Sequence, residues 1–185
     1  AECAAKYPVK DIPLLDPGDI SRYPEHIQQR IKNYSGLDPL LRRANLSGYY
    51  ACLDFVDHCI GRLLDDFEDA GLIDNTIVVY TSDHGDMTHQ HGMQGKFCLF
   101  DPSIKVPLIV SYPKALPQDK VCTALVEQLG LYPTLADLTT TGPVCSPARQ
   151  PMSGAPAAIQ DVRFTDLVHA PDLPGPDAVF SEYNL

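Results

Sequence analysis

The stretch Thr76–Pro113 reads TIVVYTSDHGDMTHQHGMQGKFCLFDPSIKVPLIVSYP, and it decides the fold that we expect. It begins and ends with apolar runs rich in β-branched residues, Thr76–Thr81 and Val106–Ser111, which are typical of strands. The first run is apolar without alternation, as in a strand that is buried on both faces. Between the two runs lies a loop dense in charged residues and histidine. Because α/β proteins bind ligands where their strands end, this loop is the predicted functional site.

The loop contains the residue types that a site for both a metal and an anion needs. Asp83 and His84 directly follow the first strand, and they offer a hard oxygen ligand and a nitrogen ligand or proton carrier. Lys96 returns a positive charge that suits an anion. Asp86 and His91 are weaker candidates for lining the site, because polar residues in such loops are more often simply solvated.

Composition limits the classes of partner. The chain has 185 residues and a formal net charge of −10, which argues against a nucleic-acid or anionic-membrane partner. No apolar run reaches the length of a membrane span, and there is no signal peptide, so the compartment stays unknown. The chain starts with Ala and stops after a strand-like run, and we therefore expect both ends to be cuts through a larger protein.

The order of elements predicts an α/β fold. The clearest helix is Asn45–Ala70, with Gly71 at the position of a C-terminal cap. Helix, turn, buried strand, loop and buried strand favour a mixed, mostly parallel sheet. The apolar residues of this helix recur at helical spacing and define one apolar stripe: Leu53, Val56, Ile60, Leu63, Leu64 and Phe67.

The segments on either side are less regular. Ala1–Leu41 is rich in proline and reads as an extended covering segment with one short helix at Glu25–Asn33. The later part of the chain predicts a helical stretch interrupted at Pro133, a long proline-rich surface connection and a final strand, at Val121–Leu138, Thr139–Pro176 and Ala178–Tyr183.

The six cysteines are scattered without a metal-binding pattern. We interpret them as buried or incidental thiols, and a disulfide of undetermined pairing is the alternative.

Several blocks of the sequence, including the loop residues described above, resemble the sulfatase family, within the alkaline-phosphatase-like superfamily of metal-dependent sulfo- and phosphohydrolases. The strongest block is S-D-H-G-D-x4-H-G-M-x2-K-x5-P-S-x-K-V-P-L-I-V. It is supported by Y-Y-A-x4-V-D-x2-I-G-R-L-L and G-L-x-D-N-T-I-V-V upstream and by Y-P-T-L-A-D-L downstream. The resemblance runs from about Tyr49 to Leu138, and weaker matches occur at Tyr7–Asp16 and Asp177–Tyr183.

The resemblance implies roles for three residues. Asp83 and His84 correspond to the second pair of active-site metal ligands, and Lys96 corresponds to the lysine that contacts the sulfate of the substrate. The family usually binds Ca²⁺, and a histidine in the ligand shell leaves room for Mn²⁺ or Zn²⁺. The family's nucleophile is a formylglycine made from the cysteine of a C-x-P-x-R motif, expected here in the parent protein. That motif and the first metal-binding carboxylates normally precede the region seen here.

One further match complicates this assignment. Cys145-Ser146-Pro147-Ala148-Arg149 fits C-x-P-x-R as written. It follows the metal-binding block instead of preceding it, and no acidic strand comes before it. We therefore favour chance over a rearranged nucleophile at Cys145.

Together these observations predict an alkaline-phosphatase-like αβα sandwich in partial form. Residues 1–138 would be the C-terminal part of a sulfatase catalytic domain, and residues 139–185 a proline-rich connection and the start of a smaller subdomain. The expected activity of the parent is metal-dependent hydrolysis of a small-molecule or carbohydrate sulfate ester. This chain alone would be inactive without the nucleophile-bearing N-terminal half. The alternatives are a phosphomonoester or phosphonate ester hydrolase, and an inactive remnant or interaction module.

Overall fold

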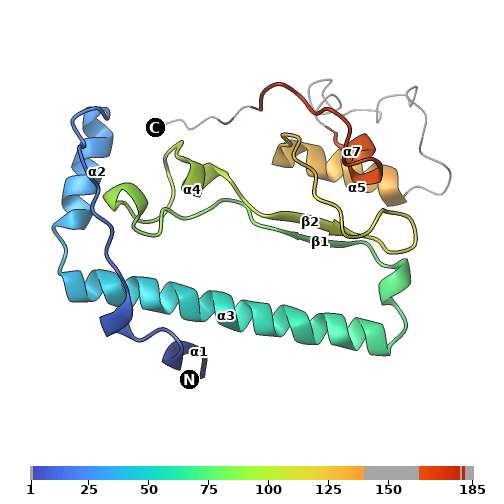
Figure 1. Cartoon of the computed structure of the whole chain (residues 1–185), viewed down its shortest axis with the longest axis horizontal. Coiled ribbons are helices and arrows are strands. Elements are labelled where there is room, and N and C mark those ends of the chain that lie inside the picture. Colours follow the sequence, from blue (N-terminus) through green and yellow to red (C-terminus); the bar gives the residue numbers. More distant parts are fainter. Residues whose placement is uncertain (1, 140–162, 180, 182–185) are drawn as a thin grey trace. The chain divides into compact units, whose positions relative to one another are not determined.

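The computed structural model describes residues 2–139, 163–179 and 181 (Figure 1). These residues form two units, each with its own internal packing. The first unit contains residues 2–73 and 81–108, and the second contains residues 74–80, 109–139, 163–179 and 181. Within the described residues, no helix has the length and apolar character needed to cross a membrane.

The first unit is mainly helical. Its α-helices are α1 (Glu2–Ala5), α2 (Glu25–Ser35), α3 (Pro39–Asp69) and α4 (Asp101–Ile104). Turns of 3-10 helix occur at Val9–Asp11 and Gln90–Gly92, and a third, Ile73–Asn75, leads from this unit into the next. The segment before residue 41 is therefore more helical than its prolines suggest, although the short helix predicted at Glu25–Asn33 is confirmed and ends at Ser35.

Helix α3 is the longest element, and local signals define both of its ends. Its N-cap is Asp38, whose Oδ1 atom accepts a hydrogen bond of 2.9 Å from the backbone N–H of Leu40. Pro39 at the first helical position also favours a helix start here, so the helix begins six residues before the predicted Asn45. At the other end Gly71 adopts φ +66, and Gly71 and Leu72 donate backbone hydrogen bonds to Glu68 and Phe67. This pattern confirms the predicted glycine cap.

The apolar stripe predicted on α3 is not buried in this structure. The buried residues of the helix are Arg42, Leu46 and Ser47, all in its first third. Leu53, Val56 and Leu63 of the stripe are 47%, 45% and 55% exposed. The predicted helix is confirmed here, and its stripe is largely exposed, because hydrophobic spacing identifies a face without identifying its partner.

The second unit combines a small sheet with short helices. Strands β1 (Val78–Thr81) and β2 (Leu108–Ser111) pair with each other and run in opposite directions (Figure 1). Both strands are two residues shorter at their start than predicted, and both are only partly buried. An antiparallel pair of this kind is one component of a mixed sheet. The remaining elements are a 3-10 turn at Gln128–Gly130, α5 (Leu131–Thr139) and α7 (Thr165–His169).

Polar contacts join α5 to the segment that contains α7. Thr134 Oγ1 accepts a hydrogen bond of 3.0 Å from the backbone N–H of Phe164, and Thr165 Oγ1 donates one of 2.8 Å to Asp137 Oδ2. Phe164 is 4% exposed and forms part of the apolar interior of this unit. The predicted surface connection therefore contains packed structure at its C-terminal side, which proline content alone did not indicate.

Two other predictions for this unit need correction. Of the helical stretch predicted at Val121–Leu138, residues 121–127 are not helical, and the helix runs through Pro133 because proline is tolerated in a first helical turn. The described residues of the predicted strand Ala178–Tyr183, namely 178, 179 and 181, form no strand. The proposed domain division after residue 138 stays a prediction.

Candidate functional site

The loop between β1 and β2 rests on helix α2. The buried side chains of Met87 and Met93 pack in one cluster with Ile27 and Ile31 of α2, and Cys98 completes it. Met87 and Met93 are 0% and 1% exposed, so their apolar packing holds the loop on the helix. The two isoleucines are four residues apart and lie on the same face of the helix. Helix α2 thus supports the segment that the sequence identifies as the site.

Backbone hydrogen bonds fold this loop back on itself. The N–H of Met87 donates to the carbonyl of Gly95 at 2.8 Å, and the N–H of His89 donates to the carbonyl of Met93 at 3.0 Å. The segment that begins with Asp83 and the segment that contains Lys96 are therefore held as two sides of one turn. The structure joins in one loop the two kinds of charge that the sequence predicts for the site.

The geometry at His84 suits a metal ligand. Its Nδ1 atom lies 2.7 Å from the carbonyl oxygen of Gly85, and because a carbonyl only accepts, Nδ1 carries the proton. In the neutral imidazole the Nε2 atom then keeps a lone pair, and it lies 3.4 Å from Oδ2 of Asp83. Metal-bound histidines commonly donate their other N–H to a backbone carbonyl in this way. Ligands at about 2.0–2.6 Å from one cation would lie about 3 Å or slightly more from each other, so this pair fits.

The backbone around this pair is fixed. The other carboxylate oxygen of Asp83, Oδ1, accepts a hydrogen bond of 3.0 Å from the N–H of His84. The next residue, Gly85, donates its N–H to the carbonyl of Ser103 at 2.9 Å. A methyl group on Gly85 would overlap the carbonyl oxygen of Pro102 and lie 2.9 Å from the carbonyl carbon. Only glycine permits this close approach of the segment that contains Asp83 and His84 to α4.

Lys96 lies between two residues with left-handed backbone angles, Gly95 at φ +75 and Phe97 at φ +69. Its Nζ atom is 5.6 Å from the centroid of the Phe97 ring, which is a cation–π distance. The guanidinium group of Arg30, from α2, donates to the carbonyl oxygens of Lys96 at 2.7 Å and Phe97 at 2.6 Å. The side chain of Lys96 is half-buried, and its backbone is tied to the helix below.

Asp86 and His91 have structural partners in this loop. Oδ1 of Asp86 accepts a hydrogen bond of 2.7 Å from the N–H of Thr88. His91 stacks on Phe100 with ring centroids 4.7 Å apart, and its Nδ1 atom is 3.1 Å from the hydroxyl of Tyr23. These contacts explain why both residues are ordered, and their role in lining the site stays a prediction.

One buried polar group of the loop, the imidazole of His89, was not predicted from the sequence. His89 is 1% exposed, and its Nε2 atom lies 2.6 Å from the hydroxyl of Tyr34 on α2.

Burial lowers the pKa of His89, the positive charge of Arg42 lowers it further, and Asp86 acts in the opposite direction. Burial likewise raises the pKa of Tyr34, against the effect of Arg42. Among the described residues, Nδ1 of His89 and Nε of Arg42 are buried and have no hydrogen-bond partner. The spacing of Ile27, Ile31 and Tyr34 marks one face of a helix in the sequence, but it carries no signal that this face meets His89.

The metal-ligand set is incomplete in the part of the chain that the structure describes. Among these residues, no group of three or more His, Cys, Asp and Glu side chains is arranged to hold a metal ion. Asp83 and His84 are therefore a pair and not a full set. The sequence match at Cys145 lies outside the described residues.

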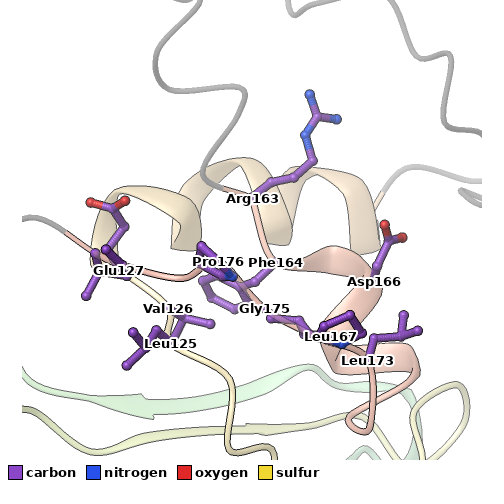
Figure 2. Close-up of a pocket in the computed structure, with 13 residues that line it drawn as sticks. Leu125, Val126, Glu127, Arg163, Phe164, Asp166, Leu167, Leu173, Gly175 and Pro176 are labelled. Atoms are coloured by element: carbon purple, nitrogen blue, oxygen red, sulfur yellow. The ribbon is translucent and has the colours of Figure 1, made fainter.

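Each unit also has a cavity away from these ligands. In the first unit a groove of about 570 Å³ runs between α2 and the loop, and its walls include Arg30, Tyr34 and Asp86. In the second unit a pocket of about 550 Å³ is lined mainly by apolar residues. Figure 2 shows the charged ends of Arg163 and Asp166 pointing away from the pocket. Binding pockets combine an apolar lining with a few polar groups that converge on the ligand, and because these two charged groups point away, the pocket is a poor candidate for the active site.

Comparison with known proteins identifies the family of the chain. A family model described as Sulfatase matches residues 8–150. A "Sulfatase" of Formosa agariphila is 39% identical over 94 residues, which cover 51% of this chain and 18% of that protein. An "N-acetylglucosamine-6-O-sulfatase" of Bacteroides thetaiotaomicron is 39% identical over 89 residues, covering 48% of this chain and 16% of that protein. The chain thus spans less than a fifth of the length of these relatives.

Solved structures agree with the fold. The crystal structure of yidJ from Bacteroides fragilis matches 91% of this chain and 32% of its own, with a TM-score of 0.61 and 26% identity. A second structure, determined in complex with its substrate D-glucosamine-2-N,6-O-disulfate, matches 84% of this chain and 29% of its own, with a TM-score of 0.60 and 27% identity. These structure neighbours are sulfatases with the alkaline-phosphatase-like fold, so the predicted fold class is confirmed, in partial form.

Proposed function

Because the chain belongs to the sulfatase family, we propose that the protein containing it hydrolyses a sulfate ester at the loop between β1 and β2. The observation that carries this proposal is the geometry of His84. Its Nδ1 atom donates to Gly85 O at 2.7 Å, so in the neutral imidazole Nε2 offers a lone pair 3.4 Å from Oδ2 of Asp83. The imidazole and the carboxylate suit a cation, and the lysine of the same loop suits the negative charge of a sulfate.

Asp83 and His84 would hold a divalent metal ion. When bound, such an ion supplies Lewis-acid charge to the oxygens of the sulfate. We propose Ca²⁺, with Mn²⁺ or Zn²⁺ as alternatives, because one ligand is a carboxylate and the other an imidazole nitrogen. Further ligands would have to come from outside the described residues. The exposure of the Asp83 side chain, 82%, leaves room for them.

Lys96 would bind the sulfate directly. A lysine ammonium is a compact charge with three donors, and in a partly desolvated site it stabilises the negative charge that grows on sulfate oxygens during hydrolysis. The position of Lys96 is defined by the turn that joins it to the metal-ligand segment, through the hydrogen bond between Met87 and Gly95. The nucleophile we propose is a formylglycine, as the family implies, located outside the part of the chain described by the structure.

The substrate class that we propose is a sulfated sugar. Two proteins similar to this chain support it: one is named for N-acetylglucosamine-6-O-sulfate, and the other was solved with D-glucosamine-2-N,6-O-disulfate. Asp83, His84 and Lys96 would account for recognition of the sulfate group, which is common to all such substrates. Selection among sugars would depend on other parts of the protein.

Metal binding by the 185-residue chain provides a first test. We expect millimolar Ca²⁺ or Mn²⁺ to raise its melting temperature by a few degrees, because a ligand that binds only the folded state stabilises it. Asp83→Ala should abolish this shift, whereas Asp65→Ala, which removes an exposed carboxylate of α3, should keep it. An equal shift in all three proteins would contradict the proposed site. The native protein should then release sulfate from 6-O-sulfated glucosamine and lose this activity with Asp83→Ala.

A further inference from the structure

We propose that Arg30 is a positioning residue for Lys96 and that it fixes the backbone conformation which presents the lysine to sulfate. This inference rests on the role proposed above for Lys96. Arg30 lies on α2, more than sixty residues earlier in the sequence, and no motif of the loop includes it. Its contribution would therefore be invisible to a comparison confined to the loop.

The contact is a fork on two consecutive carbonyl groups. Nη1 of Arg30 donates to the carbonyl oxygen of Phe97 at 2.6 Å, and Nη2 donates to that of Lys96 at 2.7 Å. A third, longer contact of 3.5 Å joins Nη2 to the carbonyl oxygen of Gln94. Hydrogen bonds from a charged guanidinium are short and strong, and the planar group fixes both acceptors relative to each other.

These two carbonyls lie on either side of the Cα atom of Phe97. The φ angle of Phe97 sets the orientation of the Lys96 carbonyl relative to this Cα atom, and the ψ angle of Phe97 sets the orientation of its own carbonyl. A rigid fork that binds both oxygens therefore holds both angles. This matters because Phe97 has φ +69, a left-handed conformation that a bulky aromatic residue adopts only where its surroundings impose it.

The conformation of Phe97 in turn places the lysine. Nζ of Lys96 lies 5.6 Å from the centroid of the Phe97 ring, which is 57% exposed and offers one face to the ammonium group. If Phe97 relaxed to a right-handed conformation, its ring would leave this position. The ammonium would then lose both its aromatic neighbour and its fixed backbone, and it would sample many orientations instead of one.

The effect of removing Arg30 should remain local. Helix α2 is also attached to the loop by Ile27 and Ile31, which are 6% and 1% exposed, and by the hydrogen bond between Tyr34 and His89. These contacts do not involve the guanidinium group. The helix and the loop should therefore stay packed when Arg30 is replaced, and the change should be confined to the segment around Lys96.

The test measures binding of inorganic sulfate to the full 185-residue chain by NMR titration, with sodium chloride of equal ionic strength as the blank. Lys96→Ala should raise the Kd for sulfate about tenfold or more, since it removes a charged donor. Arg30→Gln should raise the Kd by about fivefold or more, and the double variant should bind no more weakly than Lys96→Ala alone. The amide signals of residues 94–98 should shift in Arg30→Gln while those of α3 stay in place.

Two further variants separate positioning from other effects. Arg30→Lys keeps the positive charge but lacks the fork, so it should bind sulfate nearly as weakly as Arg30→Gln. Arg43→Gln removes an arginine that donates to the carbonyl of Ile12 at 3.0 Å, away from the loop, and it should bind like the unmodified chain. It also serves as the folding control.

The outcomes that would overturn the inference are distinct. Sulfate binding at the original strength in Arg30→Gln or in Arg30→Lys would show that the fork does not position the lysine. Independent, additive losses in the double variant would lead to the same conclusion. Unchanged binding in Lys96→Ala would instead remove the proposed role of Lys96, and the positioning role would be lost with it.

Discussion

The hydroxyl group of Tyr34 lies 2.6 Å from Nε2 of His89, and both side chains are buried, at 9% and 1% exposure. The two residues are 55 positions apart, one on helix α2 and the other in the loop that contains the proposed ligands. The centroids of the two rings are 5.3 Å apart, and the rings meet edge to face. This contact joins the loop to the helix through polar atoms, in addition to the apolar cluster beside it.

Replacing Tyr34 with phenylalanine should destabilise the protein by about 1–3 kcal/mol, because Nε2 of His89 would stay buried without its partner. The ring remains, so little packing is lost. Urea denaturation of the chain would measure the change in the free energy of unfolding. Tyr132→Phe removes a hydroxyl from a side chain that is 66% exposed, and it should change stability little. Equal stability of both variants would contradict a structural role for this hydrogen bond.

His89 should make the stability of the protein depend on pH. Burial and Arg42 lower its pKa below the ordinary value of 6.5, whereas Asp86 raises it. The unfolded chain therefore binds a proton at a higher pH than the folded chain does. The free energy of unfolding contributed by this group is complete above pH 6.5 and falls as the pH drops from 6.5 through the lowered pKa.

Denaturation curves between about pH 7.5 and pH 5 would test this dependence, which follows from proton linkage. His89→Gln should show a shallower fall in stability over this range. His26→Gln, at an exposed position of α2, should behave like the original chain. A fall of the same steepness in all three proteins would assign the pH dependence to other groups.

Gly85→Ala should destabilise the protein by about 1–3 kcal/mol, because the added methyl group overlaps the backbone of Pro102 and neither segment can move freely. The shift of the melting temperature with Ca²⁺ should be lost as well, since His84 is the neighbouring residue. Gly61→Ala is the matched control. Gly61 lies within α3 with no atom near its missing side chain, so alanine should be neutral or stabilising by up to about 1 kcal/mol. Denaturation of both variants would settle the comparison.

The described cysteines are free, and they should differ in reactivity. Cys52, Cys59 and Cys122 are exposed and should be alkylated first, whereas buried Cys98 should react only after opening of the loop. Cys3 is partly exposed, but a hydrogen bond to Asp54 and, to a lesser extent, burial raise its pKa, so it should lag behind Cys52. Alkylation followed by peptide mass analysis would measure the order, and denatured protein should lose it. Fast labelling of Cys98 would contradict the packing of the loop on α2.

Local signals predicted much of the fold. The strands, the helix at Glu25 and the glycine cap at Gly71 are formed by residues close in sequence, and these were found. The pairing of Asp83 with His84 is also local, because the two residues are adjacent. The start of α3 was missed because the prolines before it suggested an extended segment, while Pro39 in fact occupies the first helical position after the Asp38 cap.

Contacts between distant segments could not be predicted in the same way. Arg30 and Tyr34 reach the loop across 55 to 67 residues of sequence, and a single sequence has no periodicity at that range. Their helix was predicted as a short element of a covering segment, so its role as a platform for the loop was not foreseen. Likewise, α7 was hidden in a proline-rich stretch, because its packing depends on Thr134 and Asp137 of another helix.

Helix α3 has an uneven attachment to the rest of its unit, and this has a consequence for its amide protons. A helix of 31 residues is about 46 Å long, yet in the part of the chain that the structure describes no residue of α3 after Ser47 is buried. Turns that are not held by packing open one at a time, since an isolated helix is only marginally stable in water. Hydrogen exchange along α3 should therefore follow two regimes. The amides around Leu46 would exchange only when the whole unit unfolds, and those toward Asp69 would exchange by fraying from the end.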